Sequence, residues 1–191
     1  IIDSTQAGKR VIPAAEVVSV LRPESGNNWG DISPDGRKLV LSFGHIGPSG
    51  RSMVEESLQI LDLDTGQWKQ IADQGYDPLW SPDGRHIVYQ ARGQKLIAYS
   101  LETGGSFLVC PTLAQAGELT SYDWSPDGNR LAVTSVMSTT PSSIVVVRLD
   151  TPDDCLDIVS PREFIWSSSP IWSPDGKWLL YFSGSSNPSP E

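Results

Sequence analysis

The chain has 191 residues and a formal net charge of −9 at pH 7, from 23 acidic and 14 basic residues. The basic residues are scattered and form no stripe with interleaved aromatic residues. This argues against nucleic acid as a partner, because neutralisation of phosphates dominates that affinity. No run of about 18 apolar residues occurs, so the sequence predicts no membrane-spanning segment.

The N-terminal segment, residues 1–27, has the pattern of the end of a repeating unit. Ile1–Asp3 resembles the end of a strand, Lys9–Ile12 a further strand, and Glu16–Leu21 a β-prone run that leads to the first repeat. We therefore predict that this segment is the remnant of a preceding unit.

One tetrapeptide then recurs four times. Ser-Pro-Asp-Gly begins at Ser33, Ser81, Ser125 and Ser173, and three of the copies follow a tryptophan: Trp80, Trp124 and Trp172. The spacing of 44–48 residues between the serines is typical of solenoids, propellers and other repeat architectures.

The tetrapeptide has the composition of a tight turn between two strands. Proline presets φ at the second position of a type I turn, glycine is favoured at the fourth, and serine and aspartate side chains bond nearby backbone groups. Short apolar stretches flank each copy, which indicates a hairpin. The four aspartates are therefore interpreted as turn-stabilising residues: Asp35, Asp83, Asp127 and Asp175.

A second turn follows in each complete unit, at Leu63–Gly66, Leu101–Gly104 and Leu149–Pro152. β-prone residues precede and follow each of these turns, so every unit contains four short strands. No segment shows sustained helical spacing with caps, and we expect almost no helix.

Four antiparallel strands in about 45 residues match one blade of a β-propeller. Runs such as Ile144–Val147 are apolar at every position, which requires that both faces of the sheet be covered. We expect neighbouring blades to provide this cover, with the three recurring tryptophans packed between them. The sequence thus predicts an all-β fold of about four blades: a remnant at 1–27, blades at 28–72, 73–115 and 116–161, a partial blade at 162–182 and a flexible tail at 183–191.

Two explanations of the incomplete last unit remain open. In the preferred one, the chain is a fragment of a longer propeller, since it begins with Ile1 rather than methionine. In the other, the N-terminal strands complete the fourth blade and close a small ring. An open arc leaves blade faces and strand edges bare, which requires a partner such as further blades of the same parent chain.

The two cysteines, Cys110 and Cys155, fall on outermost strands of adjacent blades, at the end of one strand and the start of the other. This placement predicts Cα atoms farther apart than the limit of about 7 Å for a disulfide, and hence two free thiols. His86 follows a turn and is interpreted as a surface or edge residue. No nucleotide, nucleophile-elbow or zinc motif occurs, and neither a cofactor nor a metal is predicted.

Both kinds of turn close hairpins that start from the same side, so they are expected to share one end of the blades, the turn face. The opposite end, the loop face, carries the irregular segments, of which Gly44–Ser57 is the longest. Binding residues tend to lie in such segments. The candidates for contacts with a protein or peptide partner are His45, Arg51, Glu55, Glu56, Tyr76, Arg92, Glu118, Tyr122 and Arg162.

The repeats Pro78–Tyr89 and Pro170–Tyr181 resemble the Trp-Ser-Pro-Asp-Gly repeat of TolB-like propellers, and the resemblance covers nearly the whole chain. The first repeat departs from it, with Asp31-Ile32 where Leu-Trp or Ile-Trp stands elsewhere. The resemblance implies a six- or seven-bladed parent, commonly bacterial and often periplasmic or secreted, with a cytoplasmic location as the alternative. The shared motif is structural, so it transfers no functional residue.

Three functions are compatible with this resemblance. The leading hypothesis is a non-catalytic binding module that engages a protein or peptide through its loop face or central opening. The alternative is the gating propeller of a prolyl-oligopeptidase-type serine peptidase whose catalytic domain is absent from this chain. A propeller enzyme such as a polysaccharide lyase is third, because it would need clustered histidines or metal ligands.

Overall fold

The computed structural model describes residues 30–46, 53–93, 95–113, 118–136, 143–159 and 166–184, and these residues contain no α-helix. Their strands form three sheets of four strands and one of two. The first sheet contains β1 (Gly30–Ile32), β2 (Lys38–Ile46), β3 (Met53–Asp62) and β4 (Trp68–Ala72). The second contains β5 (Tyr76–Trp80), β6 (His86–Ala91), β7 (Lys95–Ser100) and β8 (Ser106–Val109). The third contains β9 (Glu118–Trp124), β10 (Arg130–Val136), β11 (Ser143–Arg148) and β12 (Thr151–Val159), and the fourth contains β13 (Trp166–Trp172) and β14 (Leu179–Gly184).

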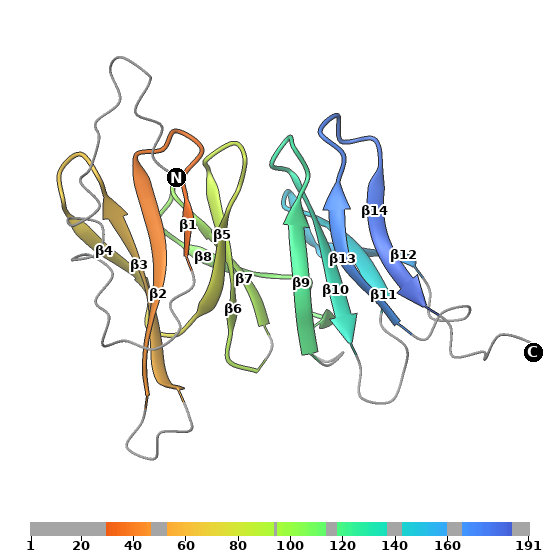
Figure 1. Ribbon diagram of the computed structural model, residues 1–191, viewed down its shortest axis with the longest axis horizontal. Coiled ribbons are helices and arrows are strands. Elements are labelled where there is room, and N and C mark those ends of the chain that lie inside the picture. The colour runs from red at the N-terminus through yellow and green to blue at the C-terminus, as the bar shows by residue number, and fades with distance from the viewer. Residues whose placement is uncertain are drawn as a thin grey trace, which may run out of the picture.

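Each sheet is an antiparallel meander in chain order, and the sheets, here called blades 1 to 4, stand side by side (Figure 1). This confirms the predicted all-β fold with repeated antiparallel blades. The predicted boundaries between blades stay a prediction, and the remnant at 1–27 and residues 185–191 of the predicted tail lie outside the described residues. Within the described ranges, no helix is long and apolar enough to cross a membrane.

The Ser-Pro-Asp-Gly segments are turns held by their own side chains. In blade 1 the Gly36 N–H donates to the Ser33 carbonyl (2.8 Å), and the Ser33 hydroxyl donates to the Asp35 carboxylate (2.6 Å). The Arg37 N–H donates to the same carboxylate (3.0 Å), and the Lys38 N–H donates to the Ser33 hydroxyl oxygen (2.8 Å). The same set of bonds recurs in the other three turns, so each repeated aspartate accepts from the serine hydroxyl and a main-chain N–H of its own turn.

These bonds also set the charge state of the turns. The serine hydroxyl, followed by the backbone N–H, holds the pKa of Asp35, Asp127 and Asp175 below the ordinary value of 3.8. A folded pKa below the unfolded one means that the stabilisation is present above pH 3.8 and is lost as the pH falls through the folded pKa.

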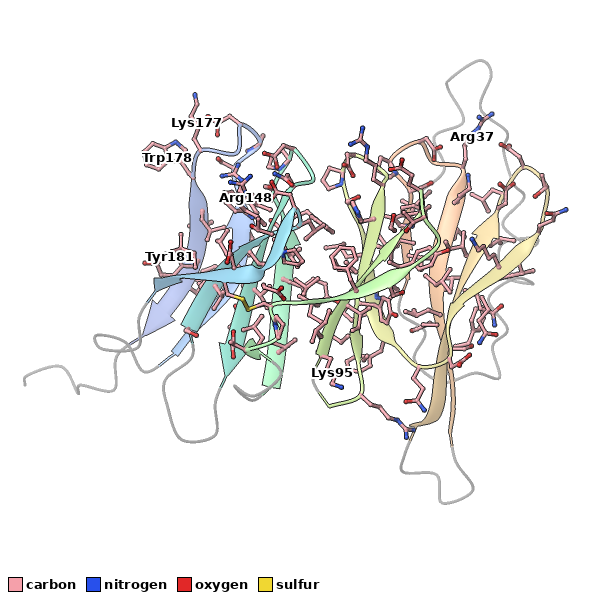
Figure 2. The ribbon with its side chains drawn as sticks, turned by 180° about the vertical axis from the view of Figure 1, so that it is seen from behind. Arg37, Lys95, Arg148, Lys177, Trp178 and Tyr181 are labelled. Atoms are coloured by element: carbon pink, nitrogen blue, oxygen red, sulfur yellow. A yellow bond between two sulfur atoms is a disulfide. The ribbon has the colours of Figure 1, made fainter. Side chains whose placement is uncertain are left out.

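Main-chain hydrogen bonds place the two kinds of turn at the same end of blades 1, 2 and 3, as expected. Leu63 N–H donates to the Arg37 carbonyl (2.8 Å), and the equivalent bonds join Leu101 to Arg85 (2.9 Å) and Leu149 to Asn129 (3.0 Å). Figure 2 shows Arg37 and Lys177 at this turn face and Lys95 at the opposite end.

The tryptophans of the repeat pack between blades. Trp80 is 5% exposed and lies in one buried cluster with Val40 and Leu58 of blade 1 and Ile87 of blade 2. Trp124 is 4% exposed and lies in a second buried cluster, which spans blades 2 and 3 and includes Val88, Leu96, Leu131 and Val133. Arg130 of blade 3 lies 4.5 Å from the centre of the Trp172 ring in blade 4. Trp80 and Trp124 are thus buried between blades, whereas Trp172 is only partly buried and contacts blade 3 through Arg130.

Two aspartates join blades in pairs. Asp31 of blade 1 accepts the N–H of its own neighbour Ile32 (2.8 Å) and the N–H of Trp80 in blade 2 (2.8 Å). We call this arrangement a carboxylate clamp, because one carboxylate binds main-chain N–H groups of two blades. Asp123 of blade 3 forms the second clamp, with Trp124 and with Trp172 of blade 4 (2.8 Å).

The two cysteines form a disulfide between blades 2 and 3, with Cα atoms 5.8 Å apart, so the prediction of free thiols is wrong. Adjacent strands of a sheet rotate by roughly 20–25°, so the outermost strands run steeply across the blade rather than parallel to the innermost ones. Figure 2 shows β12 crossing the other strands of its blade in this way and meeting the segment that follows β8. A register shift between Val147 and Arg148 adds to the effect, and the Cys110 N–H donates to the Pro152 carbonyl (2.8 Å).

We expect Ser81→Ala to lower the free energy of unfolding by about 1–3 kcal/mol, because the Asp83 carboxylate and the His86 N–H both lose the buried Ser81 hydroxyl. Ser81 is fully buried, whereas the equivalent Ser173 is more accessible, so Ser173→Ala is the matched control and should cost less. Urea unfolding of both variants measures the difference. Equal losses would contradict the role of burial.

Two substitutions of Asp123 distinguish the contribution of its hydrogen bonds to stability from the contribution of its charge. Burial raises the pKa of Asp123, so its ionisation opposes folding as the pH rises through the folded value. Asp123→Asn keeps one acceptor oxygen, which can serve Trp172, and removes the charge, so it should cost less at pH 7 than Asp123→Leu, which removes both acceptor oxygens and should cost about 1–3 kcal/mol. Thermal unfolding of both variants between pH 4 and 8 tests this, and similar losses in both would contradict it.

Candidate functional site

The structure describes the side chains of three of the nine predicted binding residues: Tyr76, Arg92 and Tyr122. Arg51 and Arg162 lie outside the described residues. Only strand positions are described for the other four: His45 on β2, Glu55 and Glu56 on β3, and Glu118 at the start of β9.

The segment expected to be the longest irregular loop is partly a hairpin. β2 continues to Ile46 and β3 begins at Met53, with Gly44 paired to Glu56. The candidates His45, Glu55 and Glu56 therefore lie on paired strands that extend from the loop face, rather than in an irregular segment. A polar segment such as residues 44–57 lacks the apolar residues that would mark it as a strand, so its sequence is hard to distinguish from that of a loop.

Tyr76 begins β5 at the loop-face end of blade 2, and Tyr122 lies just past the middle of β9 in blade 3. The structure brings these two regions together. The Tyr122 hydroxyl donates a hydrogen bond across the blade boundary to the main-chain carbonyl of Asp77, the neighbour of Tyr76. Tyr76 pairs with Gln90 of β6, whose side chain is only 4% exposed. We refer to Tyr76, Asp77, Gln90 and Tyr122 as the inter-blade polar cluster.

The backbone of this cluster is irregular. The register of β5 against β6 shifts between Tyr76 and Leu79, and Asp77 adopts φ of 54° although it is not glycine. A bulge of this kind redirects side chains and is common beside binding sites. Pro78 follows Asp77, and its ring fixes φ at a value that lets the chain continue along β5.

Burial sets the electrostatics of the cluster. It raises the pKa of the Asp77 carboxyl, although hydrogen bonds from Tyr122 and Gln90 oppose this effect. Burial, followed by the nearby charge of Asp77, raises the pKa of Tyr122 well above 10.0, so its phenol stays protonated and available as a donor. The cluster therefore combines one half-buried acidic group with neutral hydrogen-bonding groups.

A glycine permits the chain to enter β5 at this point. A Cβ atom on Gly75 would lie 2.6 Å from Leu58 Cδ1 and 2.6 Å from Tyr89 Cδ2. These contacts are too short for any residue with a side chain, so Gly75 lets the backbone before Tyr76 approach both blades closely.

A related polar contact joins the first strands of blades 3 and 4. Ser169 occupies the position of Asp77 in the repeat, has φ of 56°, and lies in a second register shift of the same kind. Its N–H donates to the Ser121 hydroxyl oxygen (3.1 Å), and that hydroxyl donates to Thr134 (3.1 Å). These residues are not among the predicted binding residues, although a polar residue recurs three positions before each tryptophan, at Asp77, Ser121 and Ser169.

His86 is half-buried rather than a surface or edge residue, so that interpretation is wrong. It lies on β6, an interior strand of its sheet, with its ring 6.2 Å from that of Phe107. Burial lowers the pKa of His86. Within the described ranges, no group of three or more His, Cys, Asp or Glu side chains could hold a metal ion.

A groove of about 340 Å³ lies between blades 1 and 2 near the turn face, lined by residues that include Lys38, Asp62, Trp68, Lys69 and Tyr99. Lys69 Nζ lies 5.6 Å above the Tyr99 ring, and Lys38 lies 3.8 Å from Asp62. This groove contains none of the predicted binding residues.

No protein-family model matches the chain. Its structure is similar to TolB from Acinetobacter baumannii, with a TM-score of 0.58 and 21% identity over 80% of this chain and 36% of that one. It is also similar to the β-propeller domain of the Trilobed protease from Pyrococcus furiosus (TM-score 0.57, 17% identity, 78% and 46% covered). A third similar structure is oligogalacturonate lyase from Vibrio parahaemolyticus (TM-score 0.60, 17% identity, 82% and 45% covered).

The chain has a β-propeller fold. It spans less than half the length of each of these three proteins. The similarity to TolB and TolB-like structures agrees with the resemblance of the repeat, while identities of this size establish the fold alone.

We expect Tyr122→Phe to lower the free energy of unfolding by about 1 kcal/mol, because the Asp77 carbonyl loses its donor at the boundary between blades 2 and 3. Tyr181→Phe, at a half-buried tyrosine of β14, is the control and should change stability less. Differential scanning calorimetry compares the two. A Tyr122→Phe variant as stable as the control variant would show that the bond contributes nothing.

Proposed function

We propose that this propeller is a non-catalytic binding module that recognises a protein or peptide through its loop face. The observation that carries the proposal is the inter-blade polar cluster, in which Tyr76, Asp77 and Tyr122 from two blades combine with the buried Gln90. Irregular polar backbone on a regular scaffold is a common setting for recognition. Glu118, Glu55, Glu56 and His45 extend the same face as strand residues, and Arg92 follows β6 in its turn.

The charge of the chain favours a partner that presents a basic group. The net charge is −9, and the Asp77 carboxyl is half-buried beside hydrogen-bond donors. A lysine, arginine or amino-terminal group placed against Asp77 would recover the solvation that the carboxylate has lost. Because the pKa of Asp77 is raised, such binding should strengthen as the pH rises through the folded pKa of Asp77.

The gating propeller of a serine peptidase is the second candidate. Similar folds occur in the Pyrococcus furiosus Trilobed protease and in a puromycin hydrolase (TM-score 0.62, 14% identity). Sequence adjoining this segment in the full reading frame distinguishes the two functions, because the peptidase would carry a Gly-x-Ser-x-Gly motif within an α/β pattern.

An extracytoplasmic location is part of the proposal. The Cys110–Cys155 disulfide supports it, because disulfides persist in the periplasm and in secreted proteins and are rare in the cytosol.

A displayed library of random peptides, selected on the immobilised full chain, tests the binding function and the face involved. We expect the enriched peptides to be rich in lysine and arginine, and to bind Asp77→Asn and Tyr122→Phe at least about tenfold more weakly, as for loss of a charged hydrogen bond. Lys177→Ala on the turn face is the matched control and should bind normally (Figure 2).

The outcome for the control decides between the faces. Normal binding by the Asp77 and Tyr122 variants together with loss in Lys177→Ala would reverse the assignment. No enrichment of peptides over a library selected on heat-unfolded chain would contradict the binding function itself.

A further inference from the structure

The three boundaries between blades are not built alike. The carboxylate clamps of Asp31 and Asp123 join blade 1 to blade 2 and blade 3 to blade 4. Leu79 of blade 2 occupies the position of these aspartates and cannot accept an N–H through its side chain. The boundary between blades 2 and 3 therefore has no clamp.

The main-chain packing follows the same division. β5 packs against β1, β2 and β3, and β13 packs against β9, β10 and β11. Between blades 2 and 3 the most extensive main-chain approach is that of the outermost strands, β8 and β12. Figure 1 shows the corresponding grouping of β1–β8 on one side and β9–β14 on the other.

Side chains and a few hydrogen bonds fill the boundary between blades 2 and 3. The apolar cluster around Trp124 spans it, and the Trp124 indole N–H donates to the Leu79 carbonyl at 3.4 Å. Apolar contacts are not directional, so they provide no fixed main-chain link of the kind that each carboxylate clamp provides. The Cys110–Cys155 disulfide is the one covalent link across this boundary in the part of the chain that the structure describes.

We propose that the chain consists of two clamped blade pairs that meet at a hinge between blades 2 and 3, and that the Cys110–Cys155 disulfide is a redox-dependent lock of this hinge. Oxidised, the lock fixes the two pairs in one orientation. Reduced, it leaves the pairs intact but lets them shift relative to one another.

The unlocking step is thiol–disulfide exchange with a dithiol reductant. One thiolate of the reductant attacks Cys155 Sγ, since Cys155 is half-buried whereas Cys110 is only 1% exposed. The S–S bond breaks, and Cys110 Sγ leaves as a thiolate beside the Thr112 hydroxyl, which lies 3.4 Å from it and can donate to it. The second thiol of the reductant then releases Cys155 and forms the reductant's own disulfide, and the two cysteines take up its two electrons and two protons.

The hinge runs through the candidate binding site. Tyr122 and Asp77 lie on opposite sides of it and are joined by one hydrogen bond, so a shift of the blade pairs changes the shape of the inter-blade polar cluster. This consequence rests on the proposed function, whereas the hinge itself does not and is tested without any ligand.

Hydrogen–deuterium exchange with mass spectrometry of the full chain, oxidised and after dithiothreitol treatment, tests the lock. We expect exchange at the Cys110 and Leu113 amides, which bond to Pro152 and Cys110, to accelerate at least about tenfold on reduction. The Trp80 and Trp172 amides, held by the two clamps, should keep their protection. The Cys110→Ser/Cys155→Ser double variant should reproduce this pattern without reductant.

Asp123→Leu in the oxidised chain is the converse control, because it should accelerate exchange at Trp172 and leave Cys110 and Leu113 protected. Unchanged exchange at Cys110 and Leu113 after complete reduction would overturn the proposal. So would equal acceleration at Trp80 and Trp172, which would mean that the disulfide stabilises the whole fold.

If the double variant does not fold, the reduced natural chain gives the same measurement. Failure of peptide binding with the exchange pattern intact would refute only the proposed function.

Discussion

The arrangement of blades depends on how the main-chain N–H groups at the start of each Ser-Pro-Asp-Gly turn find acceptors. The first strand of every blade is an edge strand, so one of its sides has no partner within the sheet. A buried N–H group without an acceptor is costly. Asp31 and Asp123 each accept two main-chain N–H groups, one in their own blade and a part-buried one in the next blade, so an aspartate in alternate blades is enough to satisfy both.

The carboxylate clamps and the indoles hold neighbouring blades together in different ways. The indoles of Trp80 and Trp124 fill the space against the preceding blade, and the carboxylate of each clamp joins the first strands of two blades. The fourth blade illustrates the result on its uncovered side: Leu180 is 61% exposed, whereas Val40 and Val88, which occupy the same position in blades 1 and 2, are fully buried by the next blade. The burial of these positions is therefore a property of the neighbouring blade rather than of the sheet to which they belong.

Local features of this fold could be predicted from sequence, and features that depend on the twist of whole sheets could not. The turns were predictable because every bond in them joins residues within five positions, and the tryptophans because they recur with the turn. The disulfide was not, since sheet twist brings Cys110 and Cys155 together from strand ends that a flat sheet would separate. Asp31 and Asp123 were visible beside their turns, but their partners are 49 residues away in the next blade.

The candidate site could be predicted only in part for the same reason. Tyr76 and Tyr122 are predictable as candidates because they lie near irregular segments, but a hydrogen bond to the Asp77 carbonyl, at a register shift of β5, joins the two regions. The boundary between blades 2 and 3 has no carboxylate clamp that holds the first strands close together. It therefore leaves more room for polar side chains such as Tyr122 than the two clamped boundaries do. A recognition site that spans two blades is therefore easier to accommodate between blades 2 and 3, where side chains and a disulfide hold the surfaces together, than at either clamp.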